Sequence, residues 1–400
     1  MSLDFGFEDL RNQVVNRGLC TVCGTCIGVC PQRCLALEYE DEDPSPVLRG
    51  ECTSCGLCLK ACPGADVPIP ELDRFCFGKT RENRPDDLGI YTYSGMGYAN
   101  DTAVRRAGAS GGVTTALLVY GLEKGLIDCA LVAGFSADRP WRAEARLAAT
   151  REELLEAAQS KYTPVPINSL LSEAVRRGYK SIALVGCPCH IHAIRKIEYR
   201  RLAPNITRKV SLLIGLLCGS QFYFEGTRHL LAELCGVDDL QHLARLQYRG
   251  RRDAGDWSSY FVAGLKSGEQ RRVSRLESLR NRLTLFTRER CSMCIDWSAE
   301  LADISVGDYW GPHIADAEGH CSVLVRTARG DDWTRKAAEA GAITLKECAA
   351  GYLLNCLGFE RKKHGGAFHL LQRQRYGWPT PNFHYQPTHA PFDSKTVPPQ

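Results

Sequence analysis

Short apolar runs alternate with segments of helical spacing through the middle of the chain. Runs at 127–133, 181–186 and 210–217 have the length of buried strands. An apolar helix that ends near Lys124 precedes the first run, and a helix with isoleucines on one side follows the second. Strands that alternate with helices predict an α/β fold with a largely parallel sheet, whose ligands gather beyond the carboxyl ends of the strands.

Changes in this pattern divide the chain into five segments. We expect a small cysteine-rich domain, a polar connector, an α/β domain that closes with another strand–helix–strand unit, a helical segment and a proline-rich extended tail. In order, their boundaries are 1–75, 76–100, 101–345, 346–377 and 378–400. The sequence leaves open whether the tail covers the protein's own surface or binds a partner chain.

Cysteine spacing adds the first chemistry. The chain has 20 cysteines, and without a secretion signal such thiols indicate metal or redox sites before disulfides. Two runs repeat the spacing C-x2-C-x2-C-x3-C-P, which is the spacing of bacterial ferredoxins with two [4Fe–4S] clusters. The first run comprises Cys20, Cys23, Cys26 and Cys30, and the second comprises Cys52, Cys55, Cys58 and Cys62.

The fourth cysteine of each run binds the other cluster in such ferredoxins. We therefore predict that Cys62 completes the cluster of the first run and that Cys30 completes the cluster of the second. A disulfide scaffold or a pair of zinc sites would explain neither the third cysteine nor the Cys-Pro pair of each run. Cys34 lies outside the motif and is expected to be a core thiol.

Charge and hydropathy exclude other classes of protein. The 50 Lys and Arg against 46 Asp and Glu leave +4, but three oxidised clusters would each add about −2, so the surplus does not indicate nucleic-acid binding. No apolar run approaches the roughly 20 residues that span a bilayer, and the acidic start lacks the pattern of a signal peptide. We expect a cytoplasmic protein, with peripheral attachment to a membrane complex left open.

A second group of cysteines lies at the expected strand ends. Cys189 and Cys218 follow two of the apolar runs, and Cys291 and Cys294 form a CxxC pair. A single CxxC pair is a weak signal, because it could also form a redox disulfide or half of a zinc site. Thiols at the ends of neighbouring strands can share one site, so these four could hold a third cluster. Six further cysteines are expected to be core thiols: Cys76, Cys129, Cys235, Cys321, Cys348 and Cys356.

The segment from Gly108 to Thr114 opens the first apolar helix. Glycines at a helix start let backbone N–H groups approach a phosphate. The segment matches neither the GxGxxG nor the GK[ST] signature. A tight turn is the alternative, and the bare pattern favours it slightly.

Seven motifs together resemble the coenzyme F420 hydrogenase/dehydrogenase beta-subunit family. In chain order they are GASGG at 108–112, SKY at 160–162, GCPCHIHAIR at 186–195, LLCG at 216–219, YRG at 248–250, CSMCxDW at 291–297 and ADISVGD at 302–308. The resemblance covers about residues 90–340. The N-terminal double-cluster domain is similar to that of members that feed electrons from reduced F420 into respiratory or sulfite-reducing complexes.

This resemblance implies a mixed α/β flavin-binding domain with its own cluster and an FAD that exchanges a hydride. It carries third-cluster ligation onto the strand-end cysteines and the CxxC pair. It carries flavin contacts onto Gly108, Ser110, Gly111, Gly112, Thr114, Lys161 and Tyr162. Lys161 would be a flavin-pocket cation, Arg249 an anion contact for F420, and His190 a group that assists proton transfer. The alternatives are a surface lysine, a solvated basic face and a helix-capping histidine. Asp303 and Asp308 could hydrogen-bond near the cofactor, but aspartates at strand ends are commonly turn formers, and that interpretation is slightly favoured.

The chain departs from the family pattern at two points. Cys187 stands where relatives often lack a cysteine, so it competes with Cys189 as a ligand. Arg251 and Arg252 follow the YRG motif where relatives tend to have Trp-Pro-Gly, which leaves the hydride donor open.

Three functions remain. The leading one is an oxidoreductase subunit that passes electrons between reduced F420 and one-electron acceptors. Its partners would be hydrogenase, formate dehydrogenase or heterodisulfide reductase subunits, or ferredoxin, in an oligomer or complex. The second is a ferredoxin-dependent FAD reductase of an organic substrate, like 7-hydroxymethyl chlorophyll a reductase in the same superfamily. The third is an electron relay without flavin, which the retained glycine-rich and SKY segments argue against.

Overall fold

A computed structural model describes residues 5–82, 88–251, 260–311 and 318–387. Its N-terminal domain consists of short helices and one antiparallel hairpin. They are, in chain order, α1 (Phe7–Leu10), η1 (Arg11–Val15), α2 (Thr25–Gly28), β1 (Leu35–Glu40), β2 (Asp43–Leu48) and α3 (Leu57–Ala61). Helix α4 (Ile69–Phe77) leads out of this domain.

Both cysteine runs adopt the same backbone geometry. Each CxxC loop contains a residue with positive φ, Val22 (54°) or Ser54 (51°). A left-handed glycine follows, Gly24 (82°) or Gly56 (72°), and caps the start of α2 or α3. The duplication in the sequence is therefore also a duplication of backbone conformation.

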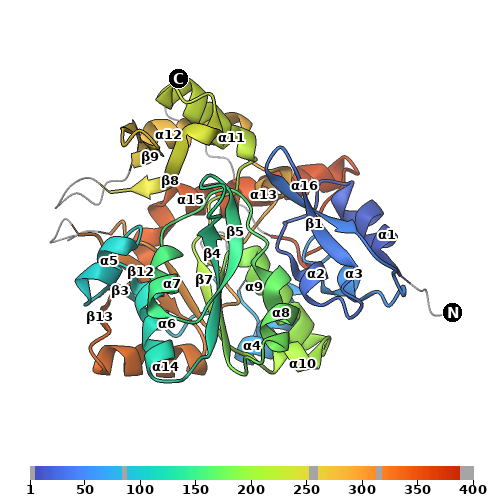
Figure 1. Cartoon of the computed structure of the whole chain (residues 1–400). Helices are drawn as coiled ribbons and strands as arrows, with labels where there is room; N and C mark the ends of the chain where they lie inside the picture. Colours follow the sequence, from blue (N-terminus) through green and yellow to red (C-terminus); the bar gives the residue numbers. More distant parts are fainter. Residues whose placement is uncertain (1–4, 83–87, 252–259, 312–317, 388–400) are drawn as a thin grey trace, which may run out of the picture.

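An eight-stranded sheet forms the centre of the molecule (Figure 1). From edge to edge its strands are β13 (Ile343–Glu347), β3 (Tyr93–Ala99), β12 (Cys321–Val325), β11 (Ile304–Asp308), β7 (Val210–Leu216), β6 (Ile182–Gly186), β4 (Cys129–Phe135) and β5 (Ala143–Ala148). Strands β11, β7, β6 and β4 are parallel, and the remaining pairs are antiparallel. The expectation of a largely parallel sheet is thus wrong outside the four central strands: β5 runs antiparallel to β4, and β12, β3 and β13 follow β11 in successive antiparallel pairs.

Each face of the sheet has its own core. One face is covered by α5 (Thr102–Ala107), α6 (Val113–Glu123) and α14 (Ala328–Glu339), with α7 (Arg151–Glu156) beside them. On the other face, the core joins sheet residues to the N-terminal domain and to four helices. These helices are α9 (Pro188–Tyr199), α8 (Leu171–Arg176), α10 (Pro204–Thr207) and η2 (Ile167–Leu170). The N-terminal domain is therefore packed onto the α/β domain through a shared core.

A smaller antiparallel sheet lies at the top of Figure 1 and was not expected from the sequence. Its strands are β8 (Leu243–Gly250), β9 (Tyr260–Leu265) and β10 (Gln270–Ser274). Around it lie α11 (Phe224–His229), η3 (Leu230–Leu234), η4 (Leu240–His242) and α12 (Arg275–Leu285). This unit has a separate core that includes Phe224, Tyr248 and Phe261.

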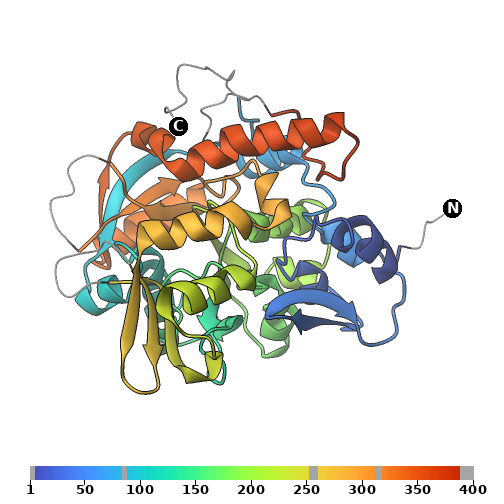
Figure 2. The same cartoon turned by 90° about the horizontal axis from the view of Figure 1, so that it is seen from above.

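The C-terminal segment crosses the molecule toward the N-terminal domain (Figure 2). It contains η5 (Ala350–Asn355), α15 (Leu357–Phe359), η6 (Glu360–Gly366) and α16 (Ala367–Arg375). The described part of the tail covers the protein's own surface: the Val67 N–H donates to the Asn382 carbonyl at 2.7 Å, and Phe383 is buried. Residues 388–400 lie outside the described part of the chain. Within that part, no helix is both long and apolar enough to cross a membrane.

Candidate functional site

The cysteines expected to hold the first cluster surround one cavity. Cys20, Cys23, Cys26 and Cys62 line one pocket, together with apolar side chains such as Leu10. Cys62 follows α3 and belongs to the second run, as expected if the fourth cysteine of each run binds the cluster of the other run. We call this pocket cavity I.

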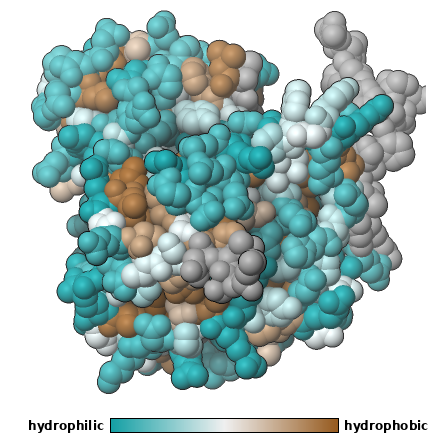
Figure 3. Space-filling model, turned by 90° about the vertical axis from the view of Figure 1, so that its right-hand side faces the viewer, coloured by the Kyte–Doolittle hydropathy of each residue, from teal (hydrophilic) through white to brown (hydrophobic). Residues whose placement is uncertain are grey.

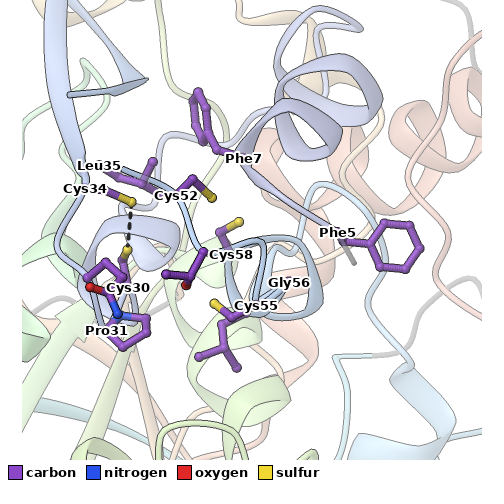
Figure 4. A pocket seen from close by; sticks show the side chains of 13 residues that line it. Phe5, Phe7, Cys30, Pro31, Cys34, Leu35, Cys52, Cys55, Gly56 and Cys58 are labelled. Carbon is purple, nitrogen blue, oxygen red and sulfur yellow. Dashed lines mark hydrogen bonds between the residues drawn. The ribbon is translucent and has the colours of Figure 1, made fainter. Parts of the chain in front are cut away.

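The second set surrounds a neighbouring pocket, which we call cavity II (Figure 4). Cys52, Cys55 and Cys58 line it with Cys30 of the first run, and Cys34 lines it as well. Among the described residues, no three His, Cys, Asp or Glu side chains are arranged to hold a single metal ion. Thiols spread around a cavity suit a four-iron cube better than a single zinc ion, whose ligands converge on one point.

The third group of thiols gathers at the carboxyl ends of adjacent strands. Cys187 and Cys189 begin α9 after β6, and Cys218 follows the neighbouring strand β7. Burial raises the pKa of Cys189 well above its usual value, and the nearby Cys218, Cys291 and Cys294 raise it further. The four cysteines that the family pattern selects therefore lie together.

Cys187 belongs to the same group as a fifth thiol. The neighbouring Cys187 thiol lowers the pKa of Cys218 to about 7, while the pKa of Cys187 itself is raised well above its usual value. The Gln221 side-chain amide lies 3.9 Å from the Cys187 sulfur. Both Cys187 and Cys189 therefore remain candidate ligands.

A buried lysine that the sequence did not single out lies against these thiols. Lys362 of η6 is 2 % exposed, and its Nζ donates to the Cys291 carbonyl at 2.6 Å. Burial opposes its charge, but the thiols of Cys294, Cys291 and Cys218 raise the pKa of Lys362 above its usual value. Its neighbour Arg361 reaches Ser220, beside Cys218. In the sequence, Lys362 could have been recognised as a candidate from the basic run Arg361-Lys362-Lys363 in the C-terminal helical segment.

His190 has both ring nitrogens engaged by the backbone. Its Nδ1 accepts from the Cys187 N–H at 3.1 Å, and its Nε2 donates to the Val165 carbonyl at 2.8 Å. Burial lowers the pKa of His190 to about 4. This geometry favours the helix-capping interpretation of His190 over a proton-transfer role.

The three groups of thiols form a continuous series. Cys23 of cavity I lies near enough to Cys189 to raise its pKa, and Cys58 of cavity II lies near enough to Cys26 to raise the pKa of that thiol. Asn168 joins cavity I to the third group, because its amide donates to Thr25 at 2.8 Å and to the His190 carbonyl at 3.1 Å.

The glycine-rich segment lies at the other end of the site. A Cβ on Gly111 would lie 2.7 Å from the Gly97 carbonyl oxygen, and Gly112 has φ 74° and a would-be Cβ 2.8 Å from the Cα of Arg105. The chain's own packing thus already requires these glycines. Of the segment, only Ala109 and Thr114 are partly exposed.

Arginines collect around this segment. Arg249, at the end of β8, donates to the Asp308 carboxylate at 2.7 Å and to the Ala109 carbonyl at 3.2 Å. Arg251 donates to the carbonyls of Gly108 and Ser110, and Arg275 lies 3.5 Å from Asp308. Asp308 is therefore an ion-pair partner at the end of β11 and not a turn former. Glu318 lies 3.3 Å from Arg251, so the three arginines still outnumber the two carboxylates, and this surplus is suited to an anionic ligand.

Tyr162 and Lys161 lie between the arginines and the thiols. Tyr162 hydrogen-bonds Arg249 through its side chain, and its carbonyl accepts from the Phe222 N–H at 2.9 Å, next to Gln221. The Lys161 Nζ donates to three carbonyls of its own loop at 2.6–3.2 Å, those of Ala157, Ala158 and Gln159. Lys161 is thus only partly exposed, and its ammonium group is bonded to carbonyls at the end of α7, which makes it neither a solvated surface lysine nor a free cation.

Asp303 also has a structural role. It is buried, and its carboxylate accepts from Arg195 at 2.8 Å and from the Leu213 N–H at 2.9 Å. It therefore joins α9 and β7 ahead of β11. Of the six cysteines expected in the core, Cys129, Cys235 and Cys321 are buried, and the other three are partly exposed.

Family models match three parts of the chain in order. "4Fe-4S dicluster domain" matches residues 12–63. Two models describe the "Coenzyme F420 hydrogenase/dehydrogenase, beta subunit", and its N-terminal part matches 96–172 while its C-terminal part matches 179–350. The first match covers both cysteine runs, and the other two cover every further motif described above.

Curated relatives agree with these matches. The beta subunit of the coenzyme F420 hydrogenase of Methanococcus voltae is 28% identical over 74% of this chain and 99% of its own length. A component of the F(420)H(2) dehydrogenase of Methanosarcina mazei is 27% identical over 90% of this chain and 94% of its own length. The coenzyme F420-dependent sulfite reductase of Methanocaldococcus jannaschii is 28% identical over 85% of this chain but only 49% of its own length.

The fold also has a solved counterpart. A chain of the F420-reducing [NiFe] hydrogenase complex from Methanosarcina barkeri superposes with a TM-score of 0.60 and 24% identity, over 77% of this chain and 99% of that chain. The mixed α/β architecture is therefore shared, and the sequence matches establish the rest: this chain carries an N-terminal 4Fe–4S dicluster domain and belongs to the coenzyme F420 hydrogenase/dehydrogenase beta-subunit family of oxidoreductases.

Proposed function

We propose that the protein is an iron–sulfur flavoprotein subunit that passes electrons between reduced coenzyme F420 and one-electron acceptors. Relatives named as F420 hydrogenase, F420H2 dehydrogenase and F420-dependent sulfite reductase support F420 as the hydride carrier. The acceptor would be a redox partner subunit or a ferredoxin, as expected for a subunit of a larger complex.

The proposed ligand sets are those that line the cavities. Cys20, Cys23, Cys26 and Cys62 would hold the cluster of cavity I, and Cys30, Cys52, Cys55 and Cys58 that of cavity II. Cys189, Cys218, Cys291 and Cys294 would hold a third [4Fe–4S] cluster, with Cys187 as the alternative to Cys189. Four soft thiolates per site match the ligand requirement of such clusters.

The flavin would lie over the glycine-rich segment. Arg249 and Arg251 are oriented toward this segment and would neutralise a diphosphate, while Tyr162 would border the ring system on the side of the third thiol group. Lys161 would act through the backbone by holding its loop against α7. When bound, FAD would exchange the electron pair of a hydride for single electrons that [4Fe–4S] clusters can carry.

The observation that carries this proposal is the continuity of the site across the molecule. From Arg249 the series runs through Tyr162 and Phe222 to Gln221 and Cys187. The thiol groups then follow one another to cavity II, where Cys52 and Cys55 are exposed. An electron pair would enter as a hydride at one end and leave as two single electrons at the other.

The experiment uses the anaerobically purified full-length protein with its cofactors intact. It is mixed separately with reduced F420, NADH, NADPH and dithionite-reduced ferredoxin, and flavin absorbance is followed. We expect rapid bleaching by reduced F420 and slow bleaching by both nicotinamides. Bleaching by ferredoxin alone would overturn the proposal and favour reduction of an organic substrate, and a preparation without flavin would favour a simple relay.

A further inference from the structure

Cavity II holds one thiol more than a cluster needs. The sulfur of Cys34 lies 3.5 Å from that of Cys30, both side chains are buried, and both line the cavity (Figure 4). A cube held by four cysteines leaves no iron for a fifth. Cys34 therefore lies beside the proposed ligand Cys30 but is not itself one of the four proposed ligands.

The local backbone holds Cys34 in this position. Arg33 adopts φ 50°, and its N–H donates to the Cys30 carbonyl at 3.2 Å, which turns the chain back on itself. The Cys34 carbonyl accepts from the Arg49 N–H at 2.8 Å, beside the β1–β2 hairpin. Two separate backbone contacts therefore fix the residue, and its sulfur faces the same space as Cys30.

The internal duplication supplies a natural comparison. Cys62 occupies the place of Cys30 in the second run, and the residue four positions later is Asp66. The Asp66 carboxylate is occupied by Lys196 and Arg200, each at 2.5 Å. Cavity I thus has Cys62 without a spare thiol in the equivalent position, whereas cavity II has one.

We propose that Cys34 is a substitute ligand for the iron atom assigned to Cys30. The inference rests on the proposed ligand set of cavity II. In the exchange, the iron–sulfur bond to Cys30 breaks and the bond to Cys34 forms. A proton passes from the Cys34 thiol to the departing Cys30 thiolate, so no electron is gained or lost. The cluster thereby survives loss or chemical modification of Cys30.

The test compares the two fourth cysteines in the full-length protein. Cys30→Ala and Cys62→Ala are purified anaerobically beside Cys34→Ala and Cys30→Ala/Cys34→Ala, and iron and sulfide are measured per chain. We expect Cys30→Ala and Cys34→Ala to keep the wild-type iron content. Cys62→Ala and the double variant should each lose about four iron atoms. Electron paramagnetic resonance of reduced Cys30→Ala should retain the cavity II signal with shifted g values.

Equal loss of iron from Cys30→Ala and Cys62→Ala would overturn the proposal. Cys30→Val, which fills the space of the thiol, repeats the comparison if the alanine variant folds poorly, and the iron of the other sites reports whether the chain is folded. Cys55→Ala separates the two hypotheses. If it loses no iron, the ligand set of cavity II is itself wrong, whereas loss from both Cys55→Ala and Cys30→Ala rejects only the substitute ligand.

Discussion

The buried charge of Lys362 gives the third thiol group an electrostatic environment of its own. A cation in a low-dielectric site favours the more negative, reduced state of a neighbouring cluster. We expect Lys362→Met to lower the midpoint potential of the third cluster by about 60 mV or more, which is a tenfold change in the reduction equilibrium of a one-electron couple. A potentiometric titration followed by electron paramagnetic resonance measures this shift.

Lys362→Arg is the matched control, because it keeps the charge and a donor for the Cys291 carbonyl. Its potential should remain near that of the wild type. An equal drop in both variants would show that Lys362 acts through packing, and no change in either would remove Lys362 from the site.

Lys161 provides a prediction of pH dependence. Burial lowers the pKa of Lys161 from 10.5 to about 7, so between these values the unfolded chain binds a proton that the folded chain lacks. The free energy of unfolding should therefore rise with pH through this window, and the penalty for burying the charge is fully present below pH 7. Chemical denaturation at about pH 7 and pH 9 should show a smaller rise in Lys161→Met than in the wild type.

The same variant distinguishes two roles for Lys161. Because the Nζ donates to three carbonyls of its own loop, we expect Lys161→Met to keep most of its flavin when purified. Loss of the flavin with an unchanged pH profile would instead identify Lys161 as a direct flavin contact.

At the scale of elements, η2 joins the ferredoxin domain to the start of α9. Asn168 is fully buried there and donates to both partners. Asn168→Ala leaves two buried acceptors without their donor, which should cost about 1–3 kcal/mol of stability. We also expect slower electron passage between the third cluster and cavity I, measured by stopped-flow absorbance. Asn205→Ala on α10 is the control, since Asn205 is exposed.

The elements predicted well from sequence are those whose signal is local and apolar. Strand β6 and helices α6 and α9 agree with their expected ranges within a few residues, because each buries a continuous face. Strand β3 lay in the expected connector, since Gly95 and Gly97 weaken its pattern. A Cβ on Gly95 would lie 2.8 Å from the Leu345 side chain of β13. Glycine is therefore required there by close contact with a neighbouring strand and not by a local pattern.

The same distinction applies to the site. The cysteine runs could be recognised because three of the four ligands proposed for each cube are closely spaced in the chain. Lys362 follows Cys291 by a long stretch of sequence, and Asn168 meets Thr25 only after the two domains have packed. Strand β10 was missed because, of its five residues, only Val273 is buried. Such residues depend on tertiary contacts that periodicity does not encode.

At the scale of the whole molecule, the site has an inner end and an outer end. The glycine-rich segment lies under the small sheet, whereas Cys52 and Cys55 reach the surface of the ferredoxin domain. The side of the molecule that carries this domain is mainly hydrophilic with scattered hydrophobic residues (Figure 3). A polar surface around an exposed redox site suits transient docking of an electron partner more than a permanent apolar contact.

A linear series of sites predicts which step each cysteine variant blocks. With reduced F420 as donor, Cys291→Ala should still show flavin bleaching, but reduction of the ferredoxin clusters should slow at least tenfold, because the link between Tyr162 and cavity I is lost.

Cys55→Ala should leave both steps intact up to cavity I. Its defect should appear in the opposite direction, as slow flavin reduction by dithionite-reduced ferredoxin, because electrons from a protein donor enter at the exposed cysteines. Stopped-flow absorbance of the flavin and the clusters measures each step, with Cys348→Ala as a control at a cysteine outside all three thiol groups. Unchanged cluster reduction in Cys291→Ala would mean that electrons bypass the third group, and the order of sites across the molecule would then not be the order of transfer.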